Sequence, residues 1–228
     1  MKKKLILTIM ACVAIIAAQA DNRYNFNAGW KLHVEKNMKG ADKPDFDDAG
    51  WKNVTLPRAW NQEEAFSCHG RNASDSIAWY RKTFTLTKEM KQGKKFFIEF
   101  EGVRQGAHVW LNGHELGWSD NGVMAFGFDM TPYINKEGKN VLAVWTDNCW
   151  RYKEHNETIS EKGKPQHSGF QWNDRNFYAN YGGINKNVWI HVMGDIYQTL
   201  PLYSNLGTTG IYICEELRRE RSQSFDTC

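Results

Sequence analysis

The chain has 228 residues, a length that fits one large domain or two small ones. Hydrophobic residues make up 41% and charged residues 24%, which excludes a mainly disordered, collagen-like or low-complexity chain. Residues 1–20 hold three of the 29 basic residues and no acidic one, so the rest has 26 basic and 26 acidic side chains. Without a basic excess to attract phosphates, nucleic acid is not expected as a partner.

The first twenty residues have the pattern of a secretory signal peptide. Lysines at positions 2–4 precede an apolar run over 5–18, and Ala18-Gln19-Ala20 resembles a cleavage site. A run of about 14 residues is too short to span a bilayer. The pattern predicts a bacterial protein exported to the periplasm or medium, with no membrane attachment after cleavage. The alternative is a lipoprotein lipidated at Cys12, which the apolar residues after Cys12 disfavour.

Export would place the mature chain in an oxidising compartment. It would keep Cys68, Cys149, Cys214 and Cys228, and the sequence does not choose among their pairings, Cys68 with Cys149 included. The spacings of Cys and His match no zinc pattern, so no metal or cofactor is predicted.

The remaining pattern is that of β-strands. Apolar residues alternate with polar ones in short runs separated by turn residues, and long helical periodicity is missing. The runs are residues 79–86, 96–100, 107–111, 141–145 and 188–192. Asn112-Gly113 favours a tight hairpin turn within residues 107–118. Short strands without crossover helices predict an all-β antiparallel sandwich.

Two stretches depart from this pattern. Residues 148–180 are long, polar and aromatic, without a clean strand, which indicates a functional or disordered loop. Residues 211–213 look like the start of a new strand, and residues 214–228 are highly charged with few apolar residues. This tail is expected to be disordered, and a truncated gene or shifted reading frame would explain it.

A series of short motifs in a fixed order carries a family resemblance. The motifs are residues 27–30 (NAGW), 46–51 (FDDAGW), 54–57 (VTLP), 78–84 (AWYRKTF), 100–103 (FEGV), 109–113 (VWLNG), 128–133 (FDMTPY), 140–144 (NVLAV) and 182–189 (GGINKNVW). The series resembles the N-terminal sugar-binding jelly-roll domain of glycoside hydrolase family 2, which contains β-galactosidases and β-glucuronidases. The resemblance implies a galactose-binding-like jelly roll over residues 21–194. Residues 195–213 would then be a linker and the first strand of an immunoglobulin-like domain.

The family's enzymes are retaining exo-β-glycosidases that use two carboxyl groups. In the family, both glutamates lie in a (β/α)₈ barrel, which needs about 250 residues. Because 34 residues follow residue 194, no catalytic residue is predicted in this chain. Glu157 follows Asn156, as the family's acid follows an asparagine, but it lies in a polar run and is interpreted as a solvated loop residue.

The resemblance also implies which residues contact sugar. Loops of the jelly roll shape the sugar subsite in full-length relatives, and Asp75 and Asp174 are the nearest matches to their polar positions. Trp172 and Asn173 beside Asp174 could stack on a sugar and bind its hydroxyls. Further candidates for substrate binding are Trp150, Arg151, Asn180 and Tyr181. The alternative is a surface loop whose aromatic residues pack on the sandwich.

Other motif residues are interpreted as structural. Trp30, Trp51 and Trp79 are expected to pack the sandwich, and Asp129 is expected to cap a turn. Arg81 is expected to pair with a carboxylate such as Glu101.

One motif departs from the family. Ala59 replaces a short acidic residue in the segment 56–60, which puts in doubt membership of the best-known β-galactosidase subgroup.

Three functions stay open. The first is the sugar-binding portion of a family 2 glycosidase, which would bind a β-glycoside and pack on its own immunoglobulin-like and barrel domains. The second is a free-standing carbohydrate-binding module, and the third is a truncated product without a function.

Overall fold

The structure is a computed structural model that describes residues 22–67, 76–148, 181–195 and 197. Its strands are β1 (Asn22–Asn25), β2 (Trp30–Val34), β3 (Lys52–Val54), β4 (Ile77–Phe84), β5 (Lys95–Phe100), β6 (Val103–Arg104), β7 (Gly106–Leu111), β8 (His114–Ser119), β9 (Phe126–Asp129), β10 (Asn140–Asp147), β11 (Gly183–Ile184) and β12 (Val188–Met193). A six-residue helix α2 (Gln62–Ser67) and a 3₁₀ turn η2 (Met90–Gln92) are the helical elements of these ranges. The predicted all-β class is confirmed.

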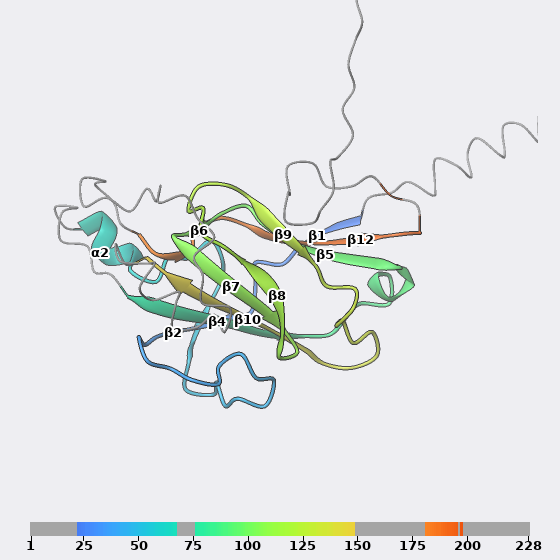
Figure 1. Cartoon of the computed structure of the whole chain (residues 1–228), viewed down its shortest axis with the longest axis horizontal. Helices are drawn as coiled ribbons and strands as arrows, with labels where there is room; N and C mark the ends of the chain where they lie inside the picture. Colours follow the sequence, from blue (N-terminus) through green and yellow to red (C-terminus); the bar gives the residue numbers. More distant parts are fainter. Residues whose placement is uncertain (1–21, 68–75, 149–180, 196, 198–228) are drawn as a thin grey trace, which may run out of the picture.

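Two antiparallel sheets face each other (Figure 1). One has the strand order β1-β12-β5-β9 and the other β3-β2-β4-β10-β7-β8, while β11 and β6 form a separate pair. Neighbours in space are therefore often distant in sequence: β4 pairs with β10, and β5 with β12. This is the predicted sandwich.

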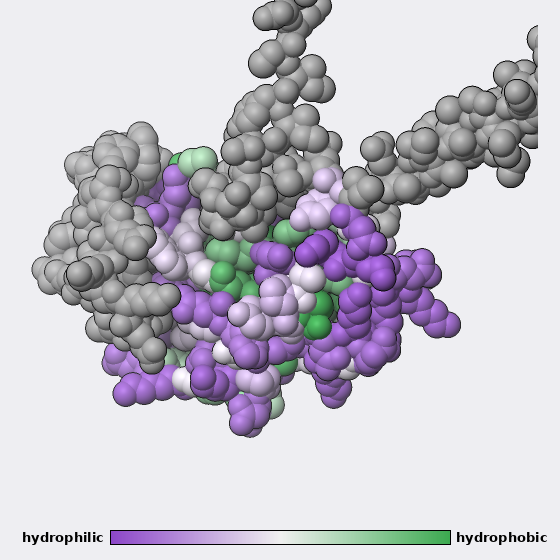
Figure 2. All heavy atoms as spheres, turned by 45° about the vertical axis from the view of Figure 1, so that its right-hand side comes forward, coloured by the Kyte–Doolittle hydropathy of each residue, from purple (hydrophilic) through white to green (hydrophobic). Residues whose placement is uncertain are grey.

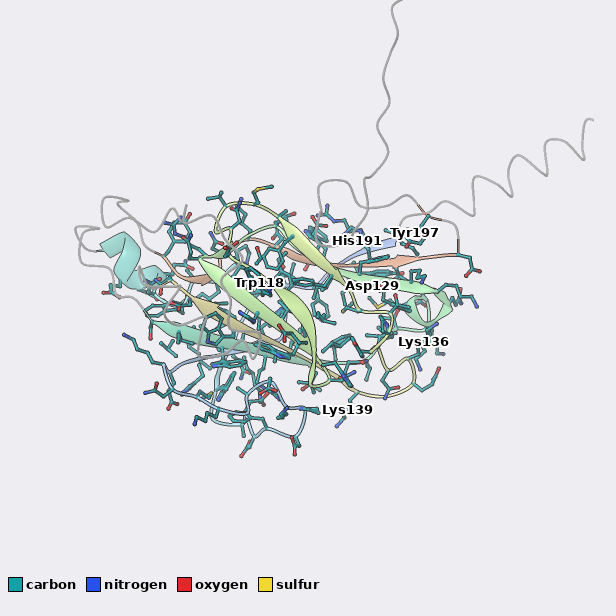
Figure 3. All side chains as sticks on the ribbon, in the orientation of Figure 1. Trp118, Asp129, Lys136, Lys139, His191 and Tyr197 are labelled. Atoms are coloured by element: carbon teal, nitrogen blue, oxygen red, sulfur yellow. The ribbon has the colours of Figure 1, made fainter. Side chains whose placement is uncertain are left out.

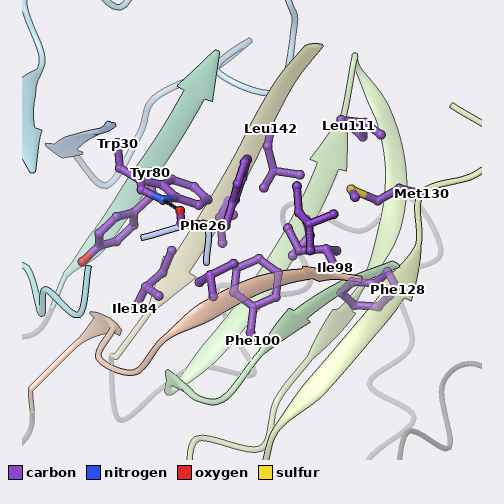
Figure 4. Packing of buried hydrophobic residues seen from close by; sticks show 14 of the residues in the cluster. Phe26, Trp30, Tyr80, Ile98, Phe100, Leu111, Phe128, Met130, Leu142 and Ile184 are labelled. Atoms are coloured by element: carbon purple, nitrogen blue, oxygen red, sulfur yellow. Dashed lines mark hydrogen bonds between the residues drawn. The ribbon is translucent and has the colours of Figure 1, made fainter. Parts of the chain in front are cut away.

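The core lies between the sheets (Figure 4). Phe96, Ile98 and Phe100 of β5 enter it, and so do alternate residues of β12, as their period-2 pattern predicts. Trp30 is completely buried there, and its indole N–H donates to the carbonyl of Phe26 at 2.8 Å. The structural interpretation of Trp30 is confirmed.

The hairpin between β7 and β8 turns at Asn112 and Gly113, as predicted. Both have positive φ, 53° and 83°, the combination that a type I′ turn requires. The Asn112 side chain also fixes the turn to β10, because its Oδ1 accepts from the Val141 amide at 2.8 Å.

A second layer of aromatic residues covers the outer face of the six-stranded sheet. Cross-strand pairing places one ring on each of five strands in a row, namely His33, Trp79, Trp145, His108 and Trp118. The ring planes of His108 and Trp118 are 24° apart, and Trp51 stacks on His33 at 22°. Because these rings pack against one another, Trp51 and Trp79 contribute to packing, as the sequence indicated.

Arg81 has a different partner from the one expected. It is 1% exposed, and its Nε donates to Asp48 Oδ2 at 2.9 Å while its Nη atoms donate to backbone carbonyls, including that of Ala41. Glu101 instead accepts from the Trp189 indole at 2.8 Å. The predicted pair was wrong because β4 lies in the six-stranded sheet, whereas Glu101 follows β5 in the other one.

The Asp48 carboxylate makes stability depend on pH. Burial raises its pKa, but the hydrogen bonds and charges of Lys31 and Arg81 outweigh burial and hold the pKa below its usual value of 3.8. A depressed folded-state pKa stabilises the protein above the unfolded pKa, and that contribution is lost as the pH falls through the folded value. Between pH 6 and about 2, wild type should therefore lose more stability than Asp48→Asn, measured by urea unfolding. Parallel pH profiles of the two proteins would contradict this expectation.

Two further local contacts involve Asp129 and Tyr197, which are labelled in Figure 3. Asp129 Oδ1 accepts from the Thr131 amide at 2.8 Å, which confirms the predicted turn cap. Tyr197, in the predicted linker, has its ring 5.5 Å from that of Phe97, whose strand partner is His191.

Within the ranges given above, no helix is long and apolar enough to cross a membrane.

Candidate functional site

The residues predicted to contact sugar lie mostly outside the described ranges. These are Asp75, Trp150, Arg151, Trp172, Asn173, Asp174 and Asn180. Tyr181 is described and is half-buried. The structure does, however, place the points from which their segments leave the sandwich.

Those points lie together. Ser76 follows residues 68–75, Asn148 precedes residues 149–180, and the Ser76 amide donates to Asn148 Oδ1 at 2.9 Å. Gly182, where the chain returns, donates its amide to Asn61 Oδ1 at 2.9 Å. The Gly182 carbonyl in turn accepts from the Trp60 amide at 2.9 Å. The C-terminal end of residues 68–75 and both ends of residues 149–180 therefore lie at the same end of the sandwich.

Strand register brings these ends together. Asp147, the last residue of β10, pairs with Ile77 at the start of β4 and with Gly106 at the start of β7. Ala107 pairs with Ser119, the last residue of β8. We call this the loop end of the domain, formed by residues 58–61, 76–77, 104–106, 119–125, 147–148 and 181–182.

Polar side chains are buried at the loop end to an unusual degree. Charged and amide groups are seldom fully buried, yet Arg104, Gln105, Asp147 and Asn148 are each at most 1% exposed. These four residues were not predicted from the sequence. The available signal was that pairs of charged and amide residues stand at the ends of strand-like runs, at 104–105 and 147–148.

Arg104 connects the sandwich to the predicted sugar-facing segment. Its guanidinium carbon lies 5.3 Å from the centre of the Tyr181 ring, a cation–π geometry. Burial lowers the pKa of Arg104, although an arginine stays charged in proteins. Arg104 also lies in β6, where it pairs with Gly183 of β11. Tyr181 is thus held at the C-terminal end of the long segment.

Tyr80 supports the same end from within the core. Burial raises the pKa of its hydroxyl, which therefore stays protonated, and this hydroxyl donates to the Arg58 carbonyl at 2.6 Å. Tyr80 fixes the backbone beside Trp60, so its role here is structural.

Some polar atoms at the loop end have no hydrogen-bond partner among the described residues. They are the Trp60 indole N–H, the Gln105 side-chain carbonyl and Arg58 Nε. Most buried polar atoms in folded proteins are paired, and hydroxyl groups could pair with both the donors and the acceptor. Because these atoms are buried, ordered water is the partner that suits them. In the same ranges, no three His, Cys, Asp or Glu side chains form a possible metal site.

The two antiparallel sheets, with buried polar groups at one end, form a domain of the galactose-binding-like class. The comparison with family models identifies the family within this class. The chain belongs to the glycosyl hydrolase 2 galactose-binding domain-like family, whose model matches residues 62–182.

Individual relatives agree with this family. A β-glucuronidase of Formosa agariphila is 36% identical over 217 residues, covering 91% of this chain and 21% of that protein. The β-galactosidase BoGH2A of Bacteroides ovatus is 32% identical over 193 residues, covering 82% of this chain and 20% of that protein. A solved β-glucuronidase from glycoside hydrolase family 2 superposes with a TM-score of 0.68 at 35% identity, over 83% of this chain and 19% of that one. The chain spans about a fifth of the length of these relatives, and it corresponds to their galactose-binding-like N-terminal domain.

Proposed function

We propose that the chain is the sugar-contacting N-terminal portion of a β-glycosidase that acts on β-glucuronides or β-galactosides. The carboxyl groups that cleave the glycosidic bond would belong to the part of the enzyme that lies beyond this portion. The names of the relatives support both substrate classes, and we place the sugar at the loop end.

One observation carries the proposal, namely the hydrogen bond between Ser76 and Asn148. It joins the residue that follows residues 68–75 to the residue that precedes residues 149–180, the two stretches in which sugar contacts are predicted. With both segments at one end, Asp75 and Asp174 can serve the same ligand, while Trp172 and Asn173 would add stacking and amide hydrogen bonds. Trp150, Arg151, Asn180 and Tyr181 are the other proposed contacts.

A free-standing carbohydrate-binding module is the second candidate. Its support is the core between the two sheets, in which large side chains such as Trp30, Phe96 and Leu142 are completely buried. For either function, we further propose that residues 1–20 direct export and are then removed.

The direct test is a titration of the purified chain with methyl β-glucuronide and methyl β-galactoside, followed by NMR. Because a subsite shared with another domain binds weakly alone, the expected Kd is on the order of 1 mM, or about −4 kcal/mol. Asp174→Asn should weaken binding about tenfold, the effect of losing about 1.4 kcal/mol. Asp45→Asn, at an exposed position, is the matched control.

Two results would contradict the proposal. One is the absence of binding to either glycoside at tens of millimolar concentration, well above the order of 1 mM. The other is hydrolysis of chromogenic β-glycosides by the purified chain, because the proposal places the cleaving groups elsewhere.

A further inference from the structure

The end of the sandwich opposite the loop end is basic. β10 runs from Asn140 to Asp147, and Asp147 belongs to the loop end, so Asn140 marks the opposite end. Two segments there, residues 88–95 and 133–139, together hold six lysines and two glutamates, an excess of four positive charges. We call these segments, with the β7–β8 turn at residues 112–114, the basic end. Figure 2 brings the right-hand side of Figure 1, where this end lies, toward the viewer and shows mostly hydrophilic side chains there.

The two segments are held side by side by their own lysines. Lys91 Nζ donates to Glu137 Oε2 at 2.7 Å, and Lys136 Nζ donates to the Gly93 carbonyl at 2.7 Å. The basic end is therefore one surface in a fixed arrangement. Three other lysines of these segments are exposed, so that their positive charges face solvent, namely Lys88, Lys94 and Lys139.

An aromatic pair borders these lysines. The Tyr133 ring stacks on that of His114, with ring centres 4.4 Å apart and planes 7° apart. Tyr133 is 40% exposed, and His114 is exposed as well. The Asn112 side-chain amide donates to the Tyr133 carbonyl and to Asn140 Oδ1, both at 2.9 Å, and Lys139 directly precedes Asn140. The pair is therefore preorganised beside the segment that carries Lys139, which lowers the cost of binding.

This combination of groups suits a saccharide that carries carboxylates. An aromatic ring can pack on the apolar C–H face of a sugar, while lysine ammonium groups attract carboxylates. A single exposed ion pair contributes little, so such a surface needs a ligand with repeated charges. The eight residues of β10 separate the two ends by about 23 Å, at about 3.3 Å per residue. A single sugar at the loop end would therefore not reach the basic end.

We propose that the basic end binds an anionic polysaccharide whose sugars carry carboxylates. The Tyr133 ring packs on one sugar, and the exposed lysines pair with the carboxylates of its neighbours. The choice of partner rests on the proposed function, because one relative is named a β-glucuronidase and glucuronides carry carboxylates. The basic end then holds the polymer, while the loop end contacts a terminal sugar.

An anionic membrane surface would also attract lysines, but stable binding to it requires a larger apolar face that enters the lipid. The exposed large hydrophobic residues of the described ranges are Val34, Val123, Met124 and Tyr133, and Tyr133 alone of these lies at the basic end. A glycan therefore fits this surface better than a membrane does.

The test is calorimetric titration of the purified chain with sodium alginate, a polymer of uronic acids. Lys88→Ala with Lys94→Ala and Lys139→Ala should weaken binding about tenfold. The matched control removes the same charge elsewhere, at three other exposed lysines, and should stay within about twofold of wild type; its changes are Lys39→Ala, Lys52→Ala and Lys186→Ala. Binding should also weaken as salt rises from about 0.01 M to about 0.15 M, because the screening length falls from about 30 Å to about 8 Å.

A second pair of variants tests the aromatic contact. Tyr133→Ala should weaken alginate binding about fivefold, whereas Tyr133→Phe, which keeps the ring face, should stay within about twofold of wild type. All variants should unfold at the same urea concentration as wild type, because the substituted side chains are exposed.

The remaining outcomes decide against the inference or separate it from the proposed function. Equal losses in the two triple variants overturn it, and so does equally tight binding of laminarin (a neutral glucan), a DNA oligonucleotide or phosphatidylglycerol vesicles. If the chain binds methyl β-glycosides but not alginate, the basic end is no glycan site and the proposed function stands. If it binds alginate through the basic end but no methyl β-glycoside, the inference stands and the proposed sugar site at the loop end is wrong.

Discussion

Arg81→Met is expected to lower the free energy of unfolding by about 3–5 kcal/mol. The guanidinium is buried, and it donates to Asp48 and to backbone carbonyls of the segment that covers the outer face of the six-stranded sheet. Methionine fills a similar volume but donates nothing, so the Asp48 carboxylate and the Ala41 carbonyl would both lose this donor. The measurement is urea unfolding, with one m-value (the slope of the unfolding free energy against urea concentration) fitted to both proteins.

Arg23→Met provides the matched control. Like Arg81, Arg23 forms ion pairs. Its guanidinium lies 3.3 Å from the Glu99 carboxylate and 3.1 Å from that of Glu101, but its side chain is 41% exposed. Exposed ion pairs contribute about 0–1 kcal/mol, so the control should lose no more than that. Equal losses in the two variants would show that burial and carbonyl contacts do not distinguish Arg81.

Gly183→Ala is expected to destabilise the protein by about 2–5 kcal/mol, from backbone strain and overpacking together. Gly183 has a φ of +97°, and a Cβ there would lie 2.8 Å from Tyr80 Cζ and overlap the hydroxyl oxygen. That hydroxyl is fixed by its bond to the Arg58 carbonyl. The substitution would therefore disturb the loop end directly, and thermal or urea unfolding measures the cost.

Two other glycines separate the contributions. Gly29 has a φ of +73° with nothing within 4 Å of an added Cβ, so Gly29→Ala should cost strain alone, about 1–2 kcal/mol. Gly50 has open space and no positive φ, so Gly50→Ala should stay within about 0.5 kcal/mol. If Gly183→Ala destabilises the protein no more than Gly29→Ala, the close contact of the added Cβ with Tyr80 does not contribute to the loss of stability.

Local pattern was sufficient to predict much of the fold. Alternation in residues 96–100 and 188–192 identified the buried faces of β5 and β12, because a strand with one side in the core must alternate. Asn112-Gly113 identified its hairpin because few residue pairs adopt two positive φ angles. No local sequence pattern predicted the order of the strands in the sheets.

Contacts between segments that are distant in the sequence were the hardest to predict. Arg81 was paired with the wrong carboxylate because its partner, Asp48, lies 33 residues away in an irregular segment. Arg104 and Asp147 were not recognised, since their burial depends on which strand ends lie together. The predicted candidates Asp75 and Asp174 came from family resemblance, and the structure adds that their segments leave the sandwich at one end.

Hydrogen exchange of the chain with and without saturating β-glycoside tests the central claim most directly. We expect slower exchange in the segments that border Ser76, Asn148 and Tyr181, because a sugar at the loop end would cover them. Protection confined to the outer face of either sheet, or unchanged exchange at proven saturation, would contradict a sugar site at this end.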